Sequence, residues 1–221
     1  RTAVVAVSAA AAASRRSPVD NPASCTFVAA VVSDGVAIVG NVGDSRAYWV
    51  PDDPTRPARQ LGQDDSYAQE QMAAGVPREQ AETGPGSHAI TRWLGVDSPD
   101  DLTPHTGDLD LDHDGWLLVC SDGLWNYCSD ATDLQGHVHR TVAALGVAGH
   151  HPISLARALT DWANACGGTD NITVAVARVG DTSPAGPAGP AGPAGSPCPP
   201  AIPATPATPA TPATDETKDT P

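Results

Sequence analysis

Short apolar runs separated by glycine-bearing turns mark the first part of the chain. Residues 26–32 and 36–42 form two such runs, and the Asp-Gly pair in the break at 33–35 predicts a hairpin between them. A third apolar run, residues 46–50, follows a second break at 43–45. We therefore expect three consecutive strands in an antiparallel meander. Their near-continuous hydrophobicity indicates that both faces of the sheet are covered.

Helical periodicity appears further along the chain. The clearest helix is predicted over residues 153–166, and helices are also expected over 64–75 and 133–148. The helix over residues 153–166 is predicted from one apolar stripe, which consists of Leu155, Leu159, Trp162, Ala163 and Cys166. Asp64 or Asp65 is a plausible N-cap of the helix over 64–75, which Gly75 ends.

The remaining segments contain two buried strands and several irregular stretches. Residues 116–121 and 172–178 are apolar and predict strands, whereas residues 76–87 lack periodicity and predict a mobile flap. Residues 89–95 favour a single helical turn, and a polar loop follows them. Because strands and helices do not alternate strictly, the pattern favours an α+β fold with antiparallel sheets and helices packed outside.

The two ends of the chain differ from its middle. Residues 181–221 consist mostly of Pro, Ala, Gly and Thr, which offer little to bury, so we expect a disordered tail. Residues 1–180 are long enough for one domain with a real core. The alanine-rich start favours a helix, with the end of a signal peptide as the alternative.

Charge and cysteine content restrict the partners and the compartment. The net charge is −14, and the tail holds four acids and one lysine, which leaves −11 for residues 1–180. An acidic domain without a basic cluster argues against nucleic acid and against anionic membranes. No apolar stretch is long enough for a membrane span. The five cysteines form no CxxC pair, and Cys25, Cys120 and Cys166 lie in apolar runs, which favours buried thiols in a reducing cytoplasm.

Three aspartates share one context, the junction of an apolar run and a glycine-bearing turn. Asp44 and Asp122 follow such runs, and Asp170 precedes one. If these strand ends are neighbours, three carboxylates converge at one rim of a sheet, which is the oxygen-rich site that Mg²⁺ or Mn²⁺ prefers. Asp next to Gly is also a common turn former, so a turn and a metal ligand both remain open for each residue.

Three stretches resemble signature motifs of the metal-dependent serine/threonine protein phosphatases, the type-2C or PPM family. They read GNVGDSRAYWV, LLVCSDGLWNY and GGTDNITVAVARV, and they occur in the family's order. The ITRWLG stretch is similar to a segment between those motifs in bacterial members, and actinobacterial members look most similar. The resemblance covers about residues 25–179.

The resemblance implies a fold, a reaction and a site. The fold is an α-β-β-α sandwich, in which two antiparallel sheets lie face to face between helices. The reaction is hydrolysis of phosphoserine and phosphothreonine in proteins by a metal-activated water, with two Mn²⁺ or Mg²⁺ ions and a possible third. By motif match, Asp122 and Asp170 are metal ligands, and Asp44 matches a position that binds the third ion in some members. The implied substrates are proteins phosphorylated by an opposing Hanks-type kinase, and the flap at 76–87 frames access to the site.

The chain departs from the family pattern before Cys25. The family's phosphate-binding Arg, its Glu-Asp pair and its Asp-Gly-x-Gly-Gly stretch are not found, and the only acid before Cys25 is Asp20. We therefore expect a phosphatase domain that lacks its N-terminal motifs. The alternative is a non-catalytic, phosphatase-like binding or regulatory module.

Two further candidate sites are weaker. Residues 110–115 fit the first six positions of an EF-hand loop, but its twelfth position is Ser121 instead of Glu, and the loop leads into an expected strand. The histidines are scattered, and His137 and His139 are expected at the surface. His88 lies in the flap, where contact with a substrate is an open alternative on which no prediction rests.

Overall fold

The computed structural model describes residues 24–95 and 97–180. The predicted tail and the alanine-rich start therefore lie outside the described residues. The strands are β1 (Ser24–Cys25), β2 (Phe27–Ser33), β3 (Val36–Val42), β4 (Arg46–Pro51), β5 (Arg59–Leu61), β6 (Leu94–Gly95), β7 (His105–Asp110), β8 (Gly115–Cys120) and β9 (Val174–Val179). The helices are α2 (Tyr67–Ala73), α3 (Arg78–Thr83), α4 (Asp122–Trp125), α5 (Ala131–Leu145), the 3₁₀ helix η1 (Gly146–His150) and α6 (Pro152–Ala165).

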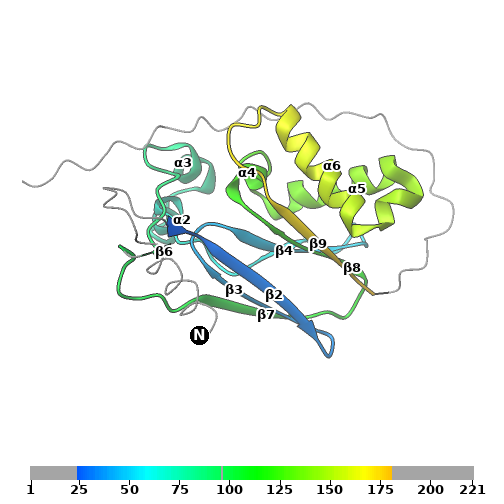
Figure 1. Ribbon diagram of the computed structural model, residues 1–221, viewed down its shortest axis with the longest axis horizontal. Helices are drawn as coiled ribbons and strands as arrows, with labels where there is room; N and C mark the ends of the chain where they lie inside the picture. The colour runs from blue at the N-terminus through cyan, green and yellow to red at the C-terminus, as the bar shows by residue number, and fades with distance from the viewer. Residues whose placement is uncertain (1–23, 96, 181–221) are drawn as a thin grey trace, which may run out of the picture.

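Two antiparallel sheets form the centre of the molecule (Figure 1). One has the order β2-β3-β7, and the other has the order β5-β4-β8-β9. The hairpin between β2 and β3 is confirmed, with Ser33 opposite Val36 and positive φ at Asp34 and Gly35. The three-strand meander is wrong, because the chain crosses at Gly43 from the first sheet to the second and β4 pairs with β5 and β8.

Alternating side chains of β4 and β8 fill two separate cores. All six residues of β4 are buried, so this strand is covered on both faces, as predicted. One set of side chains packs under α5 and α6, and it includes Tyr48, Val50, Trp116, Leu118, Leu134, Leu155 and Leu159. The other set packs between the sheets, and it includes Val39, Ala47, Trp49, Leu61 and Leu117. This two-sided burial explains why β8 is apolar along its length and why β4 is apolar after Arg46.

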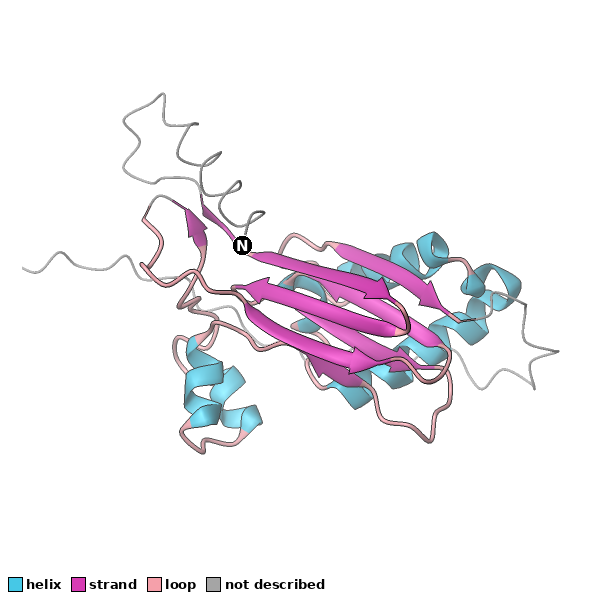
Figure 2. Ribbon diagram, turned by 90° about the horizontal axis from the view of Figure 1, so that it is seen from below, coloured by secondary structure: helices cyan, strands magenta, loops and turns pink. Residues whose placement is uncertain are grey.

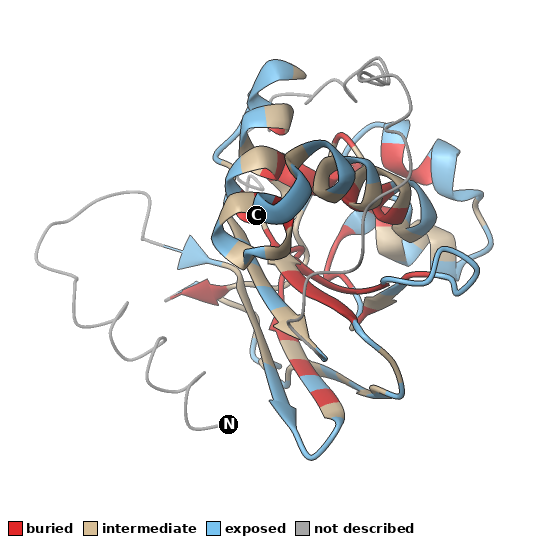
Figure 3. Ribbon diagram, turned by 90° about the vertical axis from the view of Figure 1, so that its right-hand side faces the viewer, coloured by how far each residue is buried: buried red, intermediate tan, exposed pale blue. Residues whose placement is uncertain are grey.

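Helices cover one face of the four-stranded sheet (Figures 1 and 2). The described residues form three layers of the expected α-β-β-α sandwich. These are the two sheets and the helical layer of α5 and α6. In α6 the predicted stripe is confirmed, since Leu155, Leu159 and Ala163 are buried. Val31 and Ile38 are exposed, so the prediction that both faces of these strands are covered is wrong for β2 and part of β3. Figure 3 shows the exposed stretches of the ribbon.

Three segments differ from the sequence-based expectation. Residues 105–110, expected as a polar loop, form the edge strand β7, in which half-buried and exposed residues alternate. Residues 94–95 form the short strand β6, which pairs with β1, instead of a helical turn. The flap at 76–87 is not irregular, because it contains helix α3, whose Ala81 and Glu82 are buried. In each case long-range contacts override the local pattern.

The remaining sequence-based expectations have mixed outcomes. Cys120 is buried as predicted, but Cys25 is exposed and Cys166 takes part in a disulfide, so the expectation of buried thiols fails for these two. The acidic stretch at 108–114 leads into the strand β8, not into a helix. No helix within residues 24–95 and 97–180 is long and apolar enough to cross a membrane.

His137 was expected at the surface but lies half-buried between α5 and α6. Its ring centroid is 3.9 Å from that of Trp162. Burial lowers the pKa of His137 to about 4, and Arg140 acts in the same direction. The unfolded chain, by contrast, takes up a proton near the ordinary pKa of 6.5.

The lowered pKa of His137 predicts a loss of stability in mild acid. The contribution of neutral, buried His137 to the free energy of unfolding is fully present above pH 6.5. It is lost as the pH falls towards 4, because the unfolded state binds the proton more readily than the folded state in this range. We expect the free energy of unfolding to fall by about 1–2 kcal/mol from this residue, after allowance for its partial exposure. Urea denaturation at several pH values measures it. His137→Leu should flatten the curve between pH 6.5 and 4.5, and parallel curves for the two proteins would contradict the prediction.

Candidate metal centre

Asp44 lies in the turn that carries the chain from β3 to β4. Gly43 has φ +101, and a Cβ at this position would lie 2.4 Å from Cγ2 of Thr26, so only glycine fits. The Gly43 amide donates to Oδ2 of Asp65 at 2.8 Å, and the Asp65 amide donates to the Gly43 carbonyl at 2.9 Å. The indole N–H of Trp125 donates to the Asp44 carbonyl at 2.9 Å. The backbone of Asp44 is therefore held from both sides.

Asp122 and Asp170 lie in two turns that are joined to each other. Asp122 begins α4 directly after β8, and Asp170 precedes β9, the strand paired with β8. The Ser121 hydroxyl donates to the Asn171 carbonyl at 3.0 Å and accepts from the Thr173 amide at 3.0 Å. These contacts fix the Asp122 turn against the Asp170 turn.

Gly123 and Tyr127 also hold the Asp122 turn close to the Asp170 turn. A Cβ on Gly123 would lie 2.5 Å from the Asn171 carbonyl, so the two turns approach as closely as a bare backbone allows. The Tyr127 hydroxyl accepts from the Thr169 amide at 3.2 Å. Tyr127 is buried, and it thereby orders the loop that carries Asp170.

Asp44 and Asp122 are difficult to ionise. Burial, together with the charges of Asp122 and Asp64, raises the pKa of Asp44 to about 7, and Arg46 offsets only part of this rise. Burial also raises the pKa of Asp122, and so does Asp170. Asp122 thus interacts electrostatically with both of the other candidates. A bound cation would relieve this repulsion and restore the ionised forms.

The three aspartates do not form one compact cluster. Within residues 24–95 and 97–180, no group of three His, Cys, Asp or Glu side chains is arranged to hold a metal ion. Asp44 is buried and Asp122 is half-buried, whereas Asp170 lies in an exposed loop. The donors present fit a hard cation that keeps several water ligands and takes one or two carboxylates. They remain candidate ligands.

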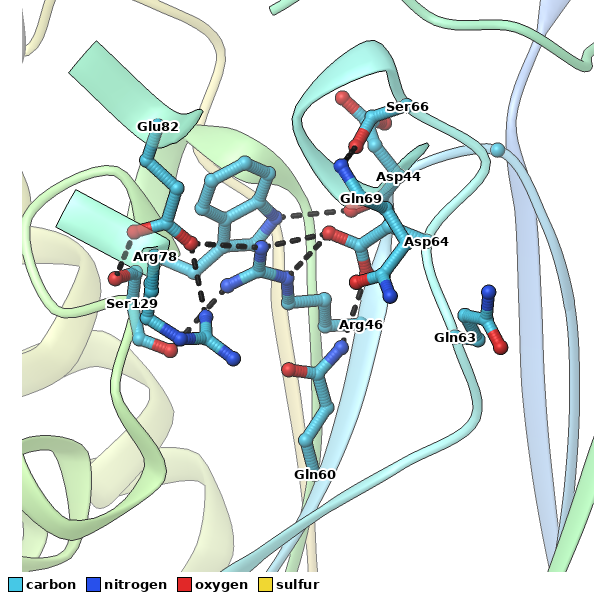
Figure 4. A network of polar contacts seen from close by, with 12 residues as sticks. Asp44, Arg46, Gln60, Gln63, Asp64, Ser66, Gln69, Arg78, Glu82 and Ser129 are labelled. Carbon is cyan, nitrogen blue, oxygen red and sulfur yellow. Dashed lines mark hydrogen bonds and ion pairs between the residues drawn. The ribbon is translucent and has the colours of Figure 1, made fainter. Parts of the chain in front are cut away.

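A buried polar network next to Asp44 was not predicted from the sequence (Figure 4). Arg46 is 3% exposed, and its guanidinium lies 2.6 Å from Oδ2 of Asp64. Its Cζ atom lies 3.6 Å from the centroid of the Trp125 ring. The Arg46 side chain is used for internal contacts and joins β4 to the loop before α2 and to α4.

A second network surrounds Asp65, which was expected as a possible N-cap. The N-cap of α2 is Ser66, whose hydroxyl accepts from the Gln69 amide. Asp65 is buried, and its Oδ1 lies 2.8 Å from Nε2 of His105 and 3.3 Å from Nη1 of Arg92. In the sequence, Asp64 and Asp65 stand next to each other before a helix that needs only one N-cap residue. This surplus of acids was the signal for the Arg46–Asp64 network and for the Asp65 network.

The sequence matches bacterial phosphatases over most of the described part. Serine/threonine phosphatase stp of Listeria innocua is 31% identical over 155 residues, which are 70% of this chain and 56% of that protein. The chain therefore spans little more than half the length of this curated relative. No family model matches the sequence.

Solved structures give the same result for the fold. Serine/threonine phosphatase Stp1 from Staphylococcus aureus has a TM-score of 0.59 and 27% identity, covering 71% of this chain and 56% of that one. The catalytic domain of PstP in complex with two manganese ions has a TM-score of 0.59 at 24% identity, covering 80% and 67%, which supports the fold alone. The motifs, the sequence match and the two sheets flanked by helices agree, and the chain belongs to the family of bacterial type-2C serine/threonine protein phosphatases.

Proposed function

We propose that the chain takes part in the metal-dependent hydrolysis of phosphoserine and phosphothreonine in proteins. The observation that carries the proposal is the placement of three motif aspartates at one edge of the four-stranded sheet, with Asp44 before β4, Asp122 after β8 and Asp170 before β9. Burial and mutual repulsion raise the pKa values of Asp44 and Asp122, and such perturbed carboxylates are typical of functional sites. The relatives compared here are named phosphatases, which gives no support to the non-catalytic alternative.

Asp122 and Asp170 would hold Mn²⁺ or Mg²⁺, and Asp44 together with Asp122 would hold a further ion. The PstP structure with the same fold is described in complex with two manganese ions. When bound, such ions supply the positive charge that activates water and neutralises a phosphoryl group, which an acidic domain cannot provide by itself.

The chain's own residues would then orient the site. Ser121 and Tyr127 hold the turns of Asp122 and Asp170 in place, and Trp125 holds the Asp44 backbone. His88 follows helix α3 at the end of the flap and is half-buried. Its Nε2 is buried and has no hydrogen-bond partner in the described part of the chain, so no contact with the substrate is assigned to it.

The proposed substrates are phosphoproteins produced by a Hanks-type kinase in the cytoplasm. The test is release of free phosphate from phosphothreonine and phosphotyrosine peptides by the purified chain, with Mn²⁺, with Mg²⁺ and with excess EDTA. We expect Mn²⁺-dependent release from the phosphothreonine peptide, abolished by EDTA and much slower with phosphotyrosine. A folded chain that binds Mn²⁺ in calorimetry but releases no phosphate would contradict the proposal.

A further inference from the structure

The flap helix α3 carries an acid that is buried although most of the helix is exposed. Glu82 is 7% exposed, whereas Arg78, Glu79 and Thr83 are exposed. The helix has six residues, and its N-cap, Pro77, makes no side-chain cap bond. So short a helix has little stability of its own, and contacts with the body of the domain must hold it.

Those contacts converge on the Glu82 carboxylate (Figure 4). Oε2 accepts from the Ser129 hydroxyl at 2.7 Å, and Oε1 accepts from Nη1 of Arg78 at 2.8 Å. Nη2 of Arg46 lies 3.6 Å from Oε1. Ser129 follows α4 and Arg46 belongs to β4, so Glu82 connects the flap to two elements of the body.

The same connection leads to the carboxylate edge. Arg46 lies two residues after Asp44 and stacks on Trp125, whose indole N–H donates to the Asp44 carbonyl. Glu82 is therefore connected to the edge that carries Asp44 through Arg46 and Trp125, without any direct contact between Glu82 and Asp44. Ala81 is also buried under α3, but a single methyl group contributes little apolar area.

We propose that Glu82 is a positioning residue that fixes the flap helix α3 against the edge carrying Asp44. The role of the flap in binding phosphoproteins rests on the proposed function, but the anchoring of α3 does not. Loss of the Glu82 charge releases α3 from Arg46 and Ser129 and leaves the sheets and α5 and α6 intact.

Hydrogen–deuterium exchange of the full chain tests the anchoring. Glu82→Gln removes the charge at nearly constant volume, and Glu79→Gln is the matched control on the exposed side of the same helix. We expect exchange over residues 76–88 to become about tenfold faster or more in Glu82→Gln, and to stay unchanged in the control. Exchange in α5 and β8 should be unaffected in both variants.

Two results would overturn the proposal. One is unchanged exchange over residues 76–88 in Glu82→Gln. The other is an equal increase in α5 and β8, which would make Glu82 a residue of global stability. Ser129→Ala supplies an independent check, because its effect should not add to that of Glu82→Gln if both act through one contact.

A kinetic measurement tests the consequence for substrate. With Mn²⁺, Glu82→Gln should raise KM for a phosphoprotein about tenfold while leaving kcat/KM for p-nitrophenyl phosphate within twofold, because a small ester does not need the flap. Equal losses for both substrates would contradict a flap role. If the unmodified chain turns over neither substrate, the proposed function fails, and the exchange measurement still decides whether Glu82 anchors α3.

Discussion

Asp122→Asn is expected to weaken Mn²⁺ binding and to reduce Mn²⁺-dependent phosphate release by about a hundredfold or more. The substitution keeps the shape of the side chain and removes the charge. Because burial and Asp170 raise the pKa of Asp122, its ionised form is costly in the metal-free fold. The variant should therefore be at least as stable as the unmodified chain in EDTA. Calorimetric Mn²⁺ titration, phosphate release and urea denaturation measure the three effects separately.

An exposed acid on α6 gives the matched control for this substitution. Asp161→Asn removes the same charge at a position outside the carboxylate edge and should leave metal affinity and turnover within about twofold. Turnover by Asp122→Asn within twofold of the unmodified chain would remove Asp122 from the metal site. A large loss of stability in EDTA would instead show that Asp122 acts mainly in holding the turn.

The largest effect on stability is expected for Arg46→Met, which removes the charge but keeps most of the side-chain length. Asp64 is buried, with Oδ2 at 2.6 Å from Nη2 of Arg46, and Glu82 is buried nearby. Removing one partner of a buried ion pair leaves the other charge uncompensated and costs about 3–5 kcal/mol. We expect a loss of that size in the free energy of unfolding, measured by urea denaturation.

Three further variants determine the origin of that loss. Arg157→Met, on the exposed side of α6, should change stability by less than about 0.5 kcal/mol. Arg46→Lys keeps the charge but loses the planar contact with Trp125. Its loss of stability should lie between those of Arg157→Met and Arg46→Met. Adding Asp64→Asn to Arg46→Met should recover part of the loss. A cost below about 1 kcal/mol for Arg46→Met would contradict the ion-pair explanation.

The sequence by itself determined the elements whose local and tertiary preferences agree. The Asp-Gly hairpin at 33–35 formed as predicted because both residues tolerate positive φ. The strand β8 and the helix α6 are also where the apolar patterns place them. The three motifs identified the family, and their aspartates lie at strand ends because Gly-bearing turns must follow buried strands there.

Only the tertiary structure decided which elements meet. The polar segment 105–110 becomes a strand because β3 offers it hydrogen-bonding partners at the edge of a sheet, and β4 leaves the meander because it pairs with β5 and β8. Arg46 and Glu82 are 36 positions apart in the sequence, and no local pattern relates them. They meet because burial of charge requires a partner, and the fold supplies that partner from a distant segment.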